Sequence, residues 1–219
     1  MKISGRRDPA DKRTEMVRKQ IRGRGISDPR VLRAMLAVAR HRFVPPRLVH
    51  AAYADRALPL GRQATISQPY VVARMTAELQ LDRDGLRVLE VGTGSGYQAA
   101  VLAECGCEVF SVERIGALFR SAGRRLSELG YADRVRLRHG DGSLGWPEQA
   151  PFDRILITAA AVAVPDVLFR QAGEQGLLVA PVGSPAGQVI RVYRRRGLEW
   201  TSRDVEGVRF VPLICDPAE

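Results

Sequence analysis

From residue 85 onward the chain alternates short apolar runs with stretches of helical length, and this alternation most constrains its fold. Five runs are rich in Val, Leu, Ile and Phe: LRVLEVG, CEVFSVE, VRLRHGD, FDRILITA and GLLVAPVG. Strands that are buried on both faces have this composition, and parallel strands need crossover helices between them. We therefore predict an α/β fold with a doubly wound, mostly parallel sheet.

The sequence on either side of this alternation predicts two additions to the sheet. Before it we expect a disordered arm over residues 1–12, followed by three helices. The first covers residues 14–24, the second runs from a cap at Ser27 or Asp28 to about residue 38, and the third covers residues 69–79. The last part has no helical period and predicts a β-hairpin or meander at an antiparallel edge. We interpret residues 1–219 as a single domain, with a helical cover (1–80), a core (85–185) and C-terminal strands (186–219).

Composition indicates a globular protein that needs no membrane and no metal. The chain is 45% hydrophobic and 26% charged, and no apolar run is long enough to cross a bilayer. Its charged N-terminus lacks the apolar region of a signal peptide. Three cysteines, Cys105, Cys107 and Cys215, have no metal-ligand spacing and are interpreted as reduced thiols. We therefore expect a cytoplasmic protein.

The net charge of +10 and the pI near 10.3 raise the question of a nucleic-acid surface. However, the basic residues are spread along the chain, which has only three lysines and no asparagine. Such a bias toward arginine is typical of coding in a GC-rich genome. We interpret the charge as a compositional effect rather than as a footprint for nucleic acid.

The stretch VLEVGTGSGYQ is the first candidate binding motif. A strand is expected to end at Glu90 and Val91, three alternating glycines follow, and a helix begins near Tyr97. Glycine lets the backbone approach a ligand closely, and the N–H groups of a helix start can bind polar groups. The G-x-G-x-G spacing differs from the G-x-G-x-x-G of dinucleotide enzymes. A tight turn without a ligand is the alternative.

Two acidic residues follow the next two strands. Glu113 lies 17 residues after Gly96, close to the ~20-residue offset at which an acid binds ribose hydroxyls. Asp141, in HGDG, follows the third strand and can accept a hydrogen bond from an adenine amino group. A surface carboxylate and a simple Asp-Gly turn are the alternatives. Because the carboxyl ends of parallel strands meet at one edge, the three motifs together predict a pocket for an adenosine.

This order of motifs resembles that of the S-adenosylmethionine-dependent methyltransferases of the Rossmann-like class, class I. Within that class the chain is similar to the protein-L-isoaspartate O-methyltransferase family along nearly its whole length. The similarity is carried by ARHRFVPP, TISQP, GTGSGYQAAVLA, GDGSLGWPEQAPFDRILITAAA and VRFVPL. The stretches GRQA and QAGEQG depart from the family pattern, as loop changes that bear on substrate reach and not on the reaction.

The resemblance implies S-adenosylmethionine as cofactor, S-adenosylhomocysteine as product, and no metal. Thr158 joins the predicted cofactor-binding residues because it follows the fourth strand at the same edge of the sheet. The implied cofactor-binding residues are Glu90, Gly92, Thr93, Gly94, Ser95, Gly96, Glu113, Asp141, Gly142 and Thr158. The implied reaction is methyl esterification of the α-carboxyl of L-isoaspartyl residues in damaged proteins and peptides, which begins repair through a succinimide.

Such a reaction needs little general acid–base catalysis from the protein. A carboxylate with a pKa near ~3.9 is already ionised at neutral pH and is itself the nucleophile, so neutral donors that orient it suffice. Thr65 and Ser67 fit this role, and the resemblance implies that Ser67 is catalytic. Capping of the helix that begins near Pro69 is the alternative for Ser67, and both roles can coexist. The resemblance also implies that the FVPL segment, with Val211, closes over the substrate peptide; a plain edge strand is its alternative.

The acceptor is predicted to be an isoaspartyl protein or peptide, bound by a monomer. Methyltransferases that act on base amino groups commonly carry D/N-P-P-Y/F after the fourth strand, where this chain has TAAA. That difference argues against nucleic acid as the substrate. The alternatives are a methyltransferase for another acceptor, such as a dedicated peptide precursor or RNA, and a scaffold that binds without catalysis.

Overall fold

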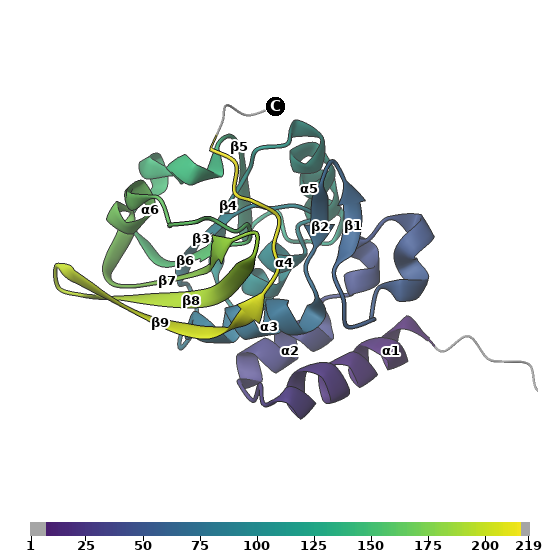
Figure 1. Cartoon of the computed structure of the whole chain (residues 1–219). Coiled ribbons are helices and arrows are strands. Elements are labelled where there is room, and N and C mark those ends of the chain that lie inside the picture. Colours follow the sequence, from purple (N-terminus) through teal and green to yellow (C-terminus); the bar gives the residue numbers. More distant parts are fainter. Residues whose placement is uncertain (1–7, 216–219) are drawn as a thin grey trace, which may run out of the picture.

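A computed structural model, which describes residues 8–215, contains a seven-stranded sheet in the order β5-β4-β3-β6-β7-β8-β9 (Figure 1). Its strands are β3 (Arg87–Val91), β4 (Glu108–Glu113), β5 (Val135–His139), β6 (Phe152–Ile157), β7 (Ala172–Ser184), β8 (Gly187–Arg196) and β9 (Glu199–Val208). The strands from β5 to β7 pair in parallel, and β7, β8 and β9 pair antiparallel. The predicted doubly wound sheet with an antiparallel C-terminal edge is therefore confirmed.

Strand β3 lies at the centre of the parallel part, between β4 and β6. Successive side chains of a strand face opposite sides of the sheet, so Val88 joins one hydrophobic core and Leu89 the other. The first core contains residues of α4 (Tyr97–Glu104) and α5 (Gly116–Glu128), and the second contains Leu168 of α6 (Asp166–Arg170). With both faces covered, the carboxyl ends of β3, β4 and β6 are left to form an open edge.

The N-terminal cover begins earlier than its sequence indicates. Helix α1 (Pro9–Met16) starts after Asp8, whose side chain accepts a hydrogen bond from the Ala10 N–H at 2.8 Å. A π-helical turn and a 3₁₀ turn continue it to residue 24. The expectation of a disordered arm is therefore wrong for residues 9–12, while residues 1–7 lie outside the described part of the chain.

Two further helices complete the cover. Asp28, not Ser27, caps α2 (Pro29–Ala37), and α3 spans Pro69–Glu78, close to the predicted bounds. Within residues 8–215, no helix combines the length and the apolar character that crossing a membrane requires.

A buried arginine fixes the cover against α4. Arg40 is fully buried, its Nε donates to the Ala52 carbonyl at 2.8 Å, and its guanidinium lies 4.9 Å from the centre of the Tyr97 ring. Burial lowers the pKa of Arg40 to about 10, so the side chain remains a cation at neutral pH. A cation over an aromatic face is an attractive contact. The cover thus helps to hold Tyr97, the first residue of α4, in place.

A hairpin that the sequence analysis missed leads from the cover to α3. Strands β1 (Leu58–Gly61) and β2 (Ala64–Ile66) are joined by Arg62 and Gln63, whose φ angles are 51° and 58°. Positive φ at both central residues is typical of a type I′ turn, which favours Asn and Gly. The stretch GRQA, which departs from the family pattern, therefore forms a tight turn whose central residues, Arg62 and Gln63, do not favour positive φ. The hairpin that this turn closes contains Thr65.

Candidate active site

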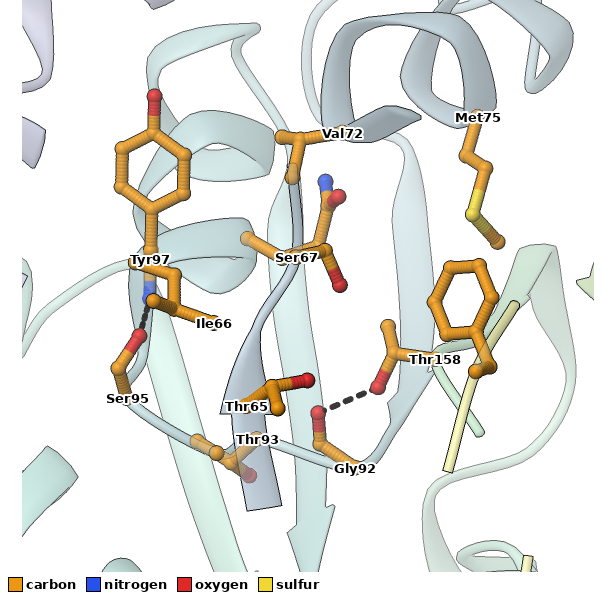
Figure 2. Close-up of a pocket in the computed structure, with 13 residues that line it drawn as sticks. Thr65, Ile66, Ser67, Val72, Met75, Gly92, Thr93, Ser95, Tyr97 and Thr158 are labelled. Atoms are coloured by element: carbon orange, nitrogen blue, oxygen red, sulfur yellow. Dashed lines mark hydrogen bonds between the residues drawn. The ribbon is translucent and has the colours of Figure 1, made fainter. Parts of the chain in front are cut away.

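One side chain adds to the backbone pairing between the ends of β3 and β6. The Thr158 hydroxyl donates to the Gly92 carbonyl oxygen at 2.7 Å (Figure 2) and has the Val91 carbonyl oxygen as a second acceptor at 3.0 Å. Gly92 has φ +96°, and a Cβ there would collide with the Thr158 Oγ1. Only glycine fits this position, because both the backbone conformation and the space exclude a side chain.

The Glu113 carboxylate ties the end of β4 to the same turn. Its Oε2 accepts a hydrogen bond from the Gly94 N–H at 2.7 Å, and its Oε1 accepts one from the Ile115 N–H at 2.9 Å. The side chain is 6% exposed and lines a cavity beside the turn. The structure therefore brings this acid and the glycine turn together, as their positions at neighbouring strand ends predict.

Helix α4 begins directly after the glycines. Gly96 has φ +86°, and a Cβ there would lie 3.1 Å from the side chain of Leu126 in α5. The Ser95 hydroxyl accepts a hydrogen bond from the Tyr97 N–H at 3.3 Å. Its positive φ and its close packing against Leu126 thus favour glycine at residue 96, which is the N-cap residue of α4, and the Ser95 hydroxyl bonds the first N–H of the helix.

A second carboxyl lies beneath the turn. Glu90 is fully buried and lines none of the cavities described below; its Oε2 accepts a hydrogen bond from the Ser111 hydroxyl at 2.5 Å. The Ser111 hydroxyl lies 2.6 Å from that of Thr93, while the Glu90 Oε1 has no partner within the described residues. Burial raises the pKa of Glu90 to about 8, and the nearby Glu113 charge adds to this effect. Ser111, which no motif marked, completes this buried support.

Asp141 lies in a tight Asp-Gly turn, as the alternative interpretation of HGDG expects. Its Oδ1 accepts a hydrogen bond from the Ser143 N–H at 2.8 Å and so caps the 3₁₀ turn Gly142–Leu144. Gly142, but not Asp141, lines the cavity, and a Cβ on Gly142 would lie 2.6 Å from Val91 Cγ1. A side chain at residue 142 would therefore push into the end of β3.

Three hollows meet at this edge of the sheet. The crevice, about 390 Å³, has a volume typical of ligand sites and is lined by residues that include Gly92, Gly94, Glu113, Gly142, Thr158 and Val211. The pouch, about 40 Å³, is lined by residues that include Ile66, Val72, Met75, Thr93, Ser95 and Tyr97. The groove, about 530 Å³, is lined by residues that include Ala57, Val71, Gln188, Val208, Arg209 and Phe210. Thr65 lines all three hollows, and Ser67 lines the pouch and the groove.

The two hydroxyls at this junction are available to a ligand. Figure 2 shows the side chains of Thr65, Ser67 and Thr158 directed toward one space, which the pouch occupies. Gln68 is the N-cap residue of α3 and no side chain caps that helix, so the capping interpretation of Ser67 is wrong. Neither Thr65 nor Ser67 has a side-chain hydrogen bond to any other residue of the described chain.

The segment that follows β9 crosses the strand ends rather than extending the sheet edge (Figure 1). The Val211 carbonyl accepts a hydrogen bond from the Ala160 N–H at 2.8 Å, and the Leu213 N–H donates to the Ala160 carbonyl at 2.7 Å. The Gln188 side chain bonds both the N–H and the carbonyl of Phe210, at 2.6 and 3.3 Å. The alternative that the FVPL segment is a plain edge strand is therefore wrong. No pattern in the sequence predicted the two hydrogen bonds between Gln188 and Phe210.

Histidines and cysteines take no part in the hollows. None of the three histidines and three cysteines lines the crevice, the pouch or the groove. Cys105 and Cys107 are free, buried thiols whose pKa burial raises to about 12. From residue 8 to residue 215, no three His, Cys, Asp or Glu side chains are grouped so that they could hold a metal.

Comparison with known proteins connects this site to one family. Residues 11–217 match the family model described as protein-L-isoaspartate(D-aspartate) O-methyltransferase (PCMT). The chain is 50% identical over 205 residues to the protein-L-isoaspartate O-methyltransferase of Methanoregula boonei, covering 94% of each chain. It is 53% identical over 203 residues to that of Methylorubrum populi, covering 92% of this chain and 94% of the relative.

Solved structures show the same fold. One protein-L-isoaspartate O-methyltransferase matches with a TM-score of 0.82 and 28% identity; the match covers 91% of this chain and only 65% of that longer chain. A structure from Plasmodium falciparum, solved in complex with S-adenosyl-L-homocysteine, matches with a TM-score of 0.81 over 93% of this chain and 99% of that one. At 22% identity the second match bears on the fold alone.

Replacing Gly92 by alanine tests the contact with Thr158. Gly25 has φ +90° with open space around it, so Gly25→Ala carries the backbone cost, about 1 kcal/mol, without a collision. We expect Gly92→Ala to lower the free energy of unfolding by roughly 1–3 kcal/mol more than Gly25→Ala, as overpacking does. Urea denaturation measures both values. Equal losses in the two variants would contradict the collision.

The buried carboxyl of Glu90 predicts a pH dependence of stability. Its pKa is raised from about 4.5 to about 8 in the folded protein. The stability that protonated Glu90 contributes is therefore fully present below pH 4.5 and is lost as the pH rises toward 8. Between these limits the wild type should lose a few kcal/mol more of its unfolding free energy than Glu90→Gln, as a rough estimate. Thermal and urea unfolding at several pH values, with the exposed Glu174→Gln as control, measure this. Parallel pH profiles of wild type and Glu90→Gln would refute it.

Proposed function

Because the chain belongs to the protein-L-isoaspartate(D-aspartate) O-methyltransferase family, we propose that it methylates the α-carboxylate of L-isoaspartyl residues in damaged proteins and peptides. The observation that carries this proposal is the meeting of the crevice, the pouch and the groove at Thr65. A transfer between two bound molecules needs two binding sites that open onto one small reaction space. The three hollows have this arrangement.

The crevice fits S-adenosylmethionine in size and in chemistry. Gly92 and Gly142 leave the strand ends without side chains, and Gly94 has open space beside its Cα with only Leu60 at 3.8 Å. The Glu113 carboxylate lies at the end of β4, where an acid accepts hydrogen bonds from ribose hydroxyls. When bound, this cofactor supplies a methyl group activated by a sulfonium, and S-adenosylhomocysteine remains as product.

The protein's own part in the reaction is orientation. The substrate carboxylate is ionised at neutral pH, so no residue has to remove a proton. The hydroxyls of Ser67 and Thr65 donate hydrogen bonds to the carboxylate and, being neutral, do not quench its charge. Correct orientation of two reactants can lower a barrier by about 7–11 kcal/mol. The apolar walls of the small pouch, Ile66, Val72 and Met75, limit the water that competes for the methyl group.

The groove suits an extended, flexible peptide segment. It runs between the start of α3 and residues 207–210, and Val211 follows directly with an N–H that has no acceptor in the described chain. The methyl ester then collapses without the enzyme to a succinimide, which hydrolyses in part to normal aspartate. We take the chain to act as one methyltransferase domain, as a monomer and in the cytoplasm, where its free thiols would stay reduced.

Methyl transfer to a defined peptide tests the proposal. Labelled S-adenosylmethionine is incubated with a peptide that contains L-isoaspartate and with the same peptide containing normal aspartate. We expect base-labile label on the isoaspartyl peptide alone. If neither peptide is labelled although the cofactor binds, the acceptor is different, and RNA and peptide precursors are the next acceptors to try.

Replacing Ser67 by alanine separates orientation from cofactor binding. A hydrogen bond to a charged group contributes about 1.5–3 kcal/mol, so kcat/KM for the isoaspartyl peptide should fall roughly 10- to 150-fold. The affinity for S-adenosylhomocysteine, measured by calorimetry, should stay unchanged. Ser202→Ala, an exposed serine on β9, is the matched control. An unchanged kcat/KM, or a parallel loss of cofactor affinity, would exclude this role for Ser67.

A further inference from the structure

The groove has one charged residue. Among the residues that the structure describes, Arg209 is the only groove-lining one with a formal charge; the others are glycines and neutral polar or apolar residues. If the groove holds the substrate peptide, as the proposed function requires, residues on either side of the isoaspartate pass this guanidinium. Ser67, which is placed to hold the isoaspartyl carboxylate, lines the same groove.

Arg209 is free to bind a substrate, unlike several arginines of strands β8 and β9. Arg191 pairs with Asp204, and Arg203 pairs with Glu78. Arg194 donates to the Gln80 side chain at 2.5 Å. Arg209 is exposed and has neither an ion pair nor a side-chain hydrogen bond within the described residues.

The acidic residue nearest to Arg209 in the sequence, Glu206, forms no ion pair with it. Glu206 accepts a hydrogen bond from the Tyr70 hydroxyl at 3.0 Å, and the Arg24 guanidinium lies 3.3 Å from the centre of the Tyr70 ring. Glu206 does not line the groove. Its carboxylate is thus engaged in a contact between α3 and β9.

The backbone beside Arg209 is held in place before any substrate binds. The Gln188 side chain accepts a hydrogen bond from the Phe210 N–H and donates one to the Phe210 carbonyl. The Val211 carbonyl accepts a hydrogen bond from the Ala160 N–H. A guanidinium on such a fixed segment loses less conformational freedom on binding than one on a loose loop. The Arg209 charge is therefore present at the groove wall before a substrate binds.

We infer that Arg209 is a specificity-determining residue that favours isoaspartyl peptides with an acidic side chain next to the damaged residue. A planar guanidinium is well shaped to bind a carboxylate through two hydrogen bonds. Because Arg209 is exposed, water screens the pair, and the preference should be roughly two- to fivefold in kcat/KM. This inference gives part of the chain's positive charge a peptide partner rather than a nucleic acid.

Peptides with a single changed residue test the inference. Each contains one L-isoaspartate, and Glu, Gln or Lys is placed in turn at each of the nearest positions on both sides. Initial rates give kcat/KM for the wild type, Arg209→Gln and Arg209→Glu. Arg196→Gln, which changes an exposed arginine at the far end of the β8–β9 hairpin, is the control.

For the wild type we expect Glu to exceed Gln, and Gln to exceed Lys, at one or more positions, chiefly through KM. The preference should shrink at about 0.5 M salt, where exposed charges are screened within a few ångströms. It should vanish in Arg209→Gln, reverse in Arg209→Glu and persist in Arg196→Gln. Equal rates for the three peptides, or a preference that survives in Arg209→Gln, would overturn the inference. The Gln peptide is the reference, since failure to methylate it would instead count against the proposed function.

Discussion

The contact between Gly92 and Thr158 is the constraint on which the site depends. The backbone pairing of β3 with β6 places the Thr158 hydroxyl so close to Gly92 that residue 92 has no room for a side chain. The turn that follows therefore stays at the edge of the sheet, where the Glu113 carboxylate can reach the Gly94 N–H. Gly92 and Thr158 line both the crevice and the pouch, so this contact forms part of the wall of each.

Among the described residues, no charged side chain lines the pouch, whereas Glu113 lines the crevice and Arg209 lines the groove. Two fully buried residues of the charged types, Glu90 beneath the glycine turn and Arg40 against α4, support the site and line none of its hollows. Hydroxyls and backbone groups surround the reaction space instead. This division suits a reaction whose nucleophile is already an anion, because a cation beside the carboxylate would lower its reactivity. The free charge of Arg209 lies along the groove, where it can act on binding.

The groove is assembled from three parts of the chain that are distant in sequence. The hairpin and the start of α3 supply one wall, the beginning of β8 supplies Gln188, and the end of β9 leads into residues 207–210. The Tyr70–Glu206 hydrogen bond connects two of these parts across 136 positions. A binding site with mostly neutral walls of this kind makes few specific demands, as recognition of damage in many different proteins requires.

The sequence by itself determined the parallel sheet, the glycine turn, the acids at the strand ends and the likeness to one family, because periodicity and turn chemistry are local properties. Tertiary structure alone decided that Ser67 does not cap α3, since the pattern before Pro69 suits a helix cap and a ligand contact equally, and the helix has Gln68 as its N-cap residue. It also placed Arg62 and Gln63 in a hairpin turn against their preferences. Ser111 and Gln188 were found only in the fold, because their roles depend on contacts between segments that no local pattern relates. Arg209 belongs to VRFVPL, a stretch that carries the family likeness, but only the fold places it on the groove.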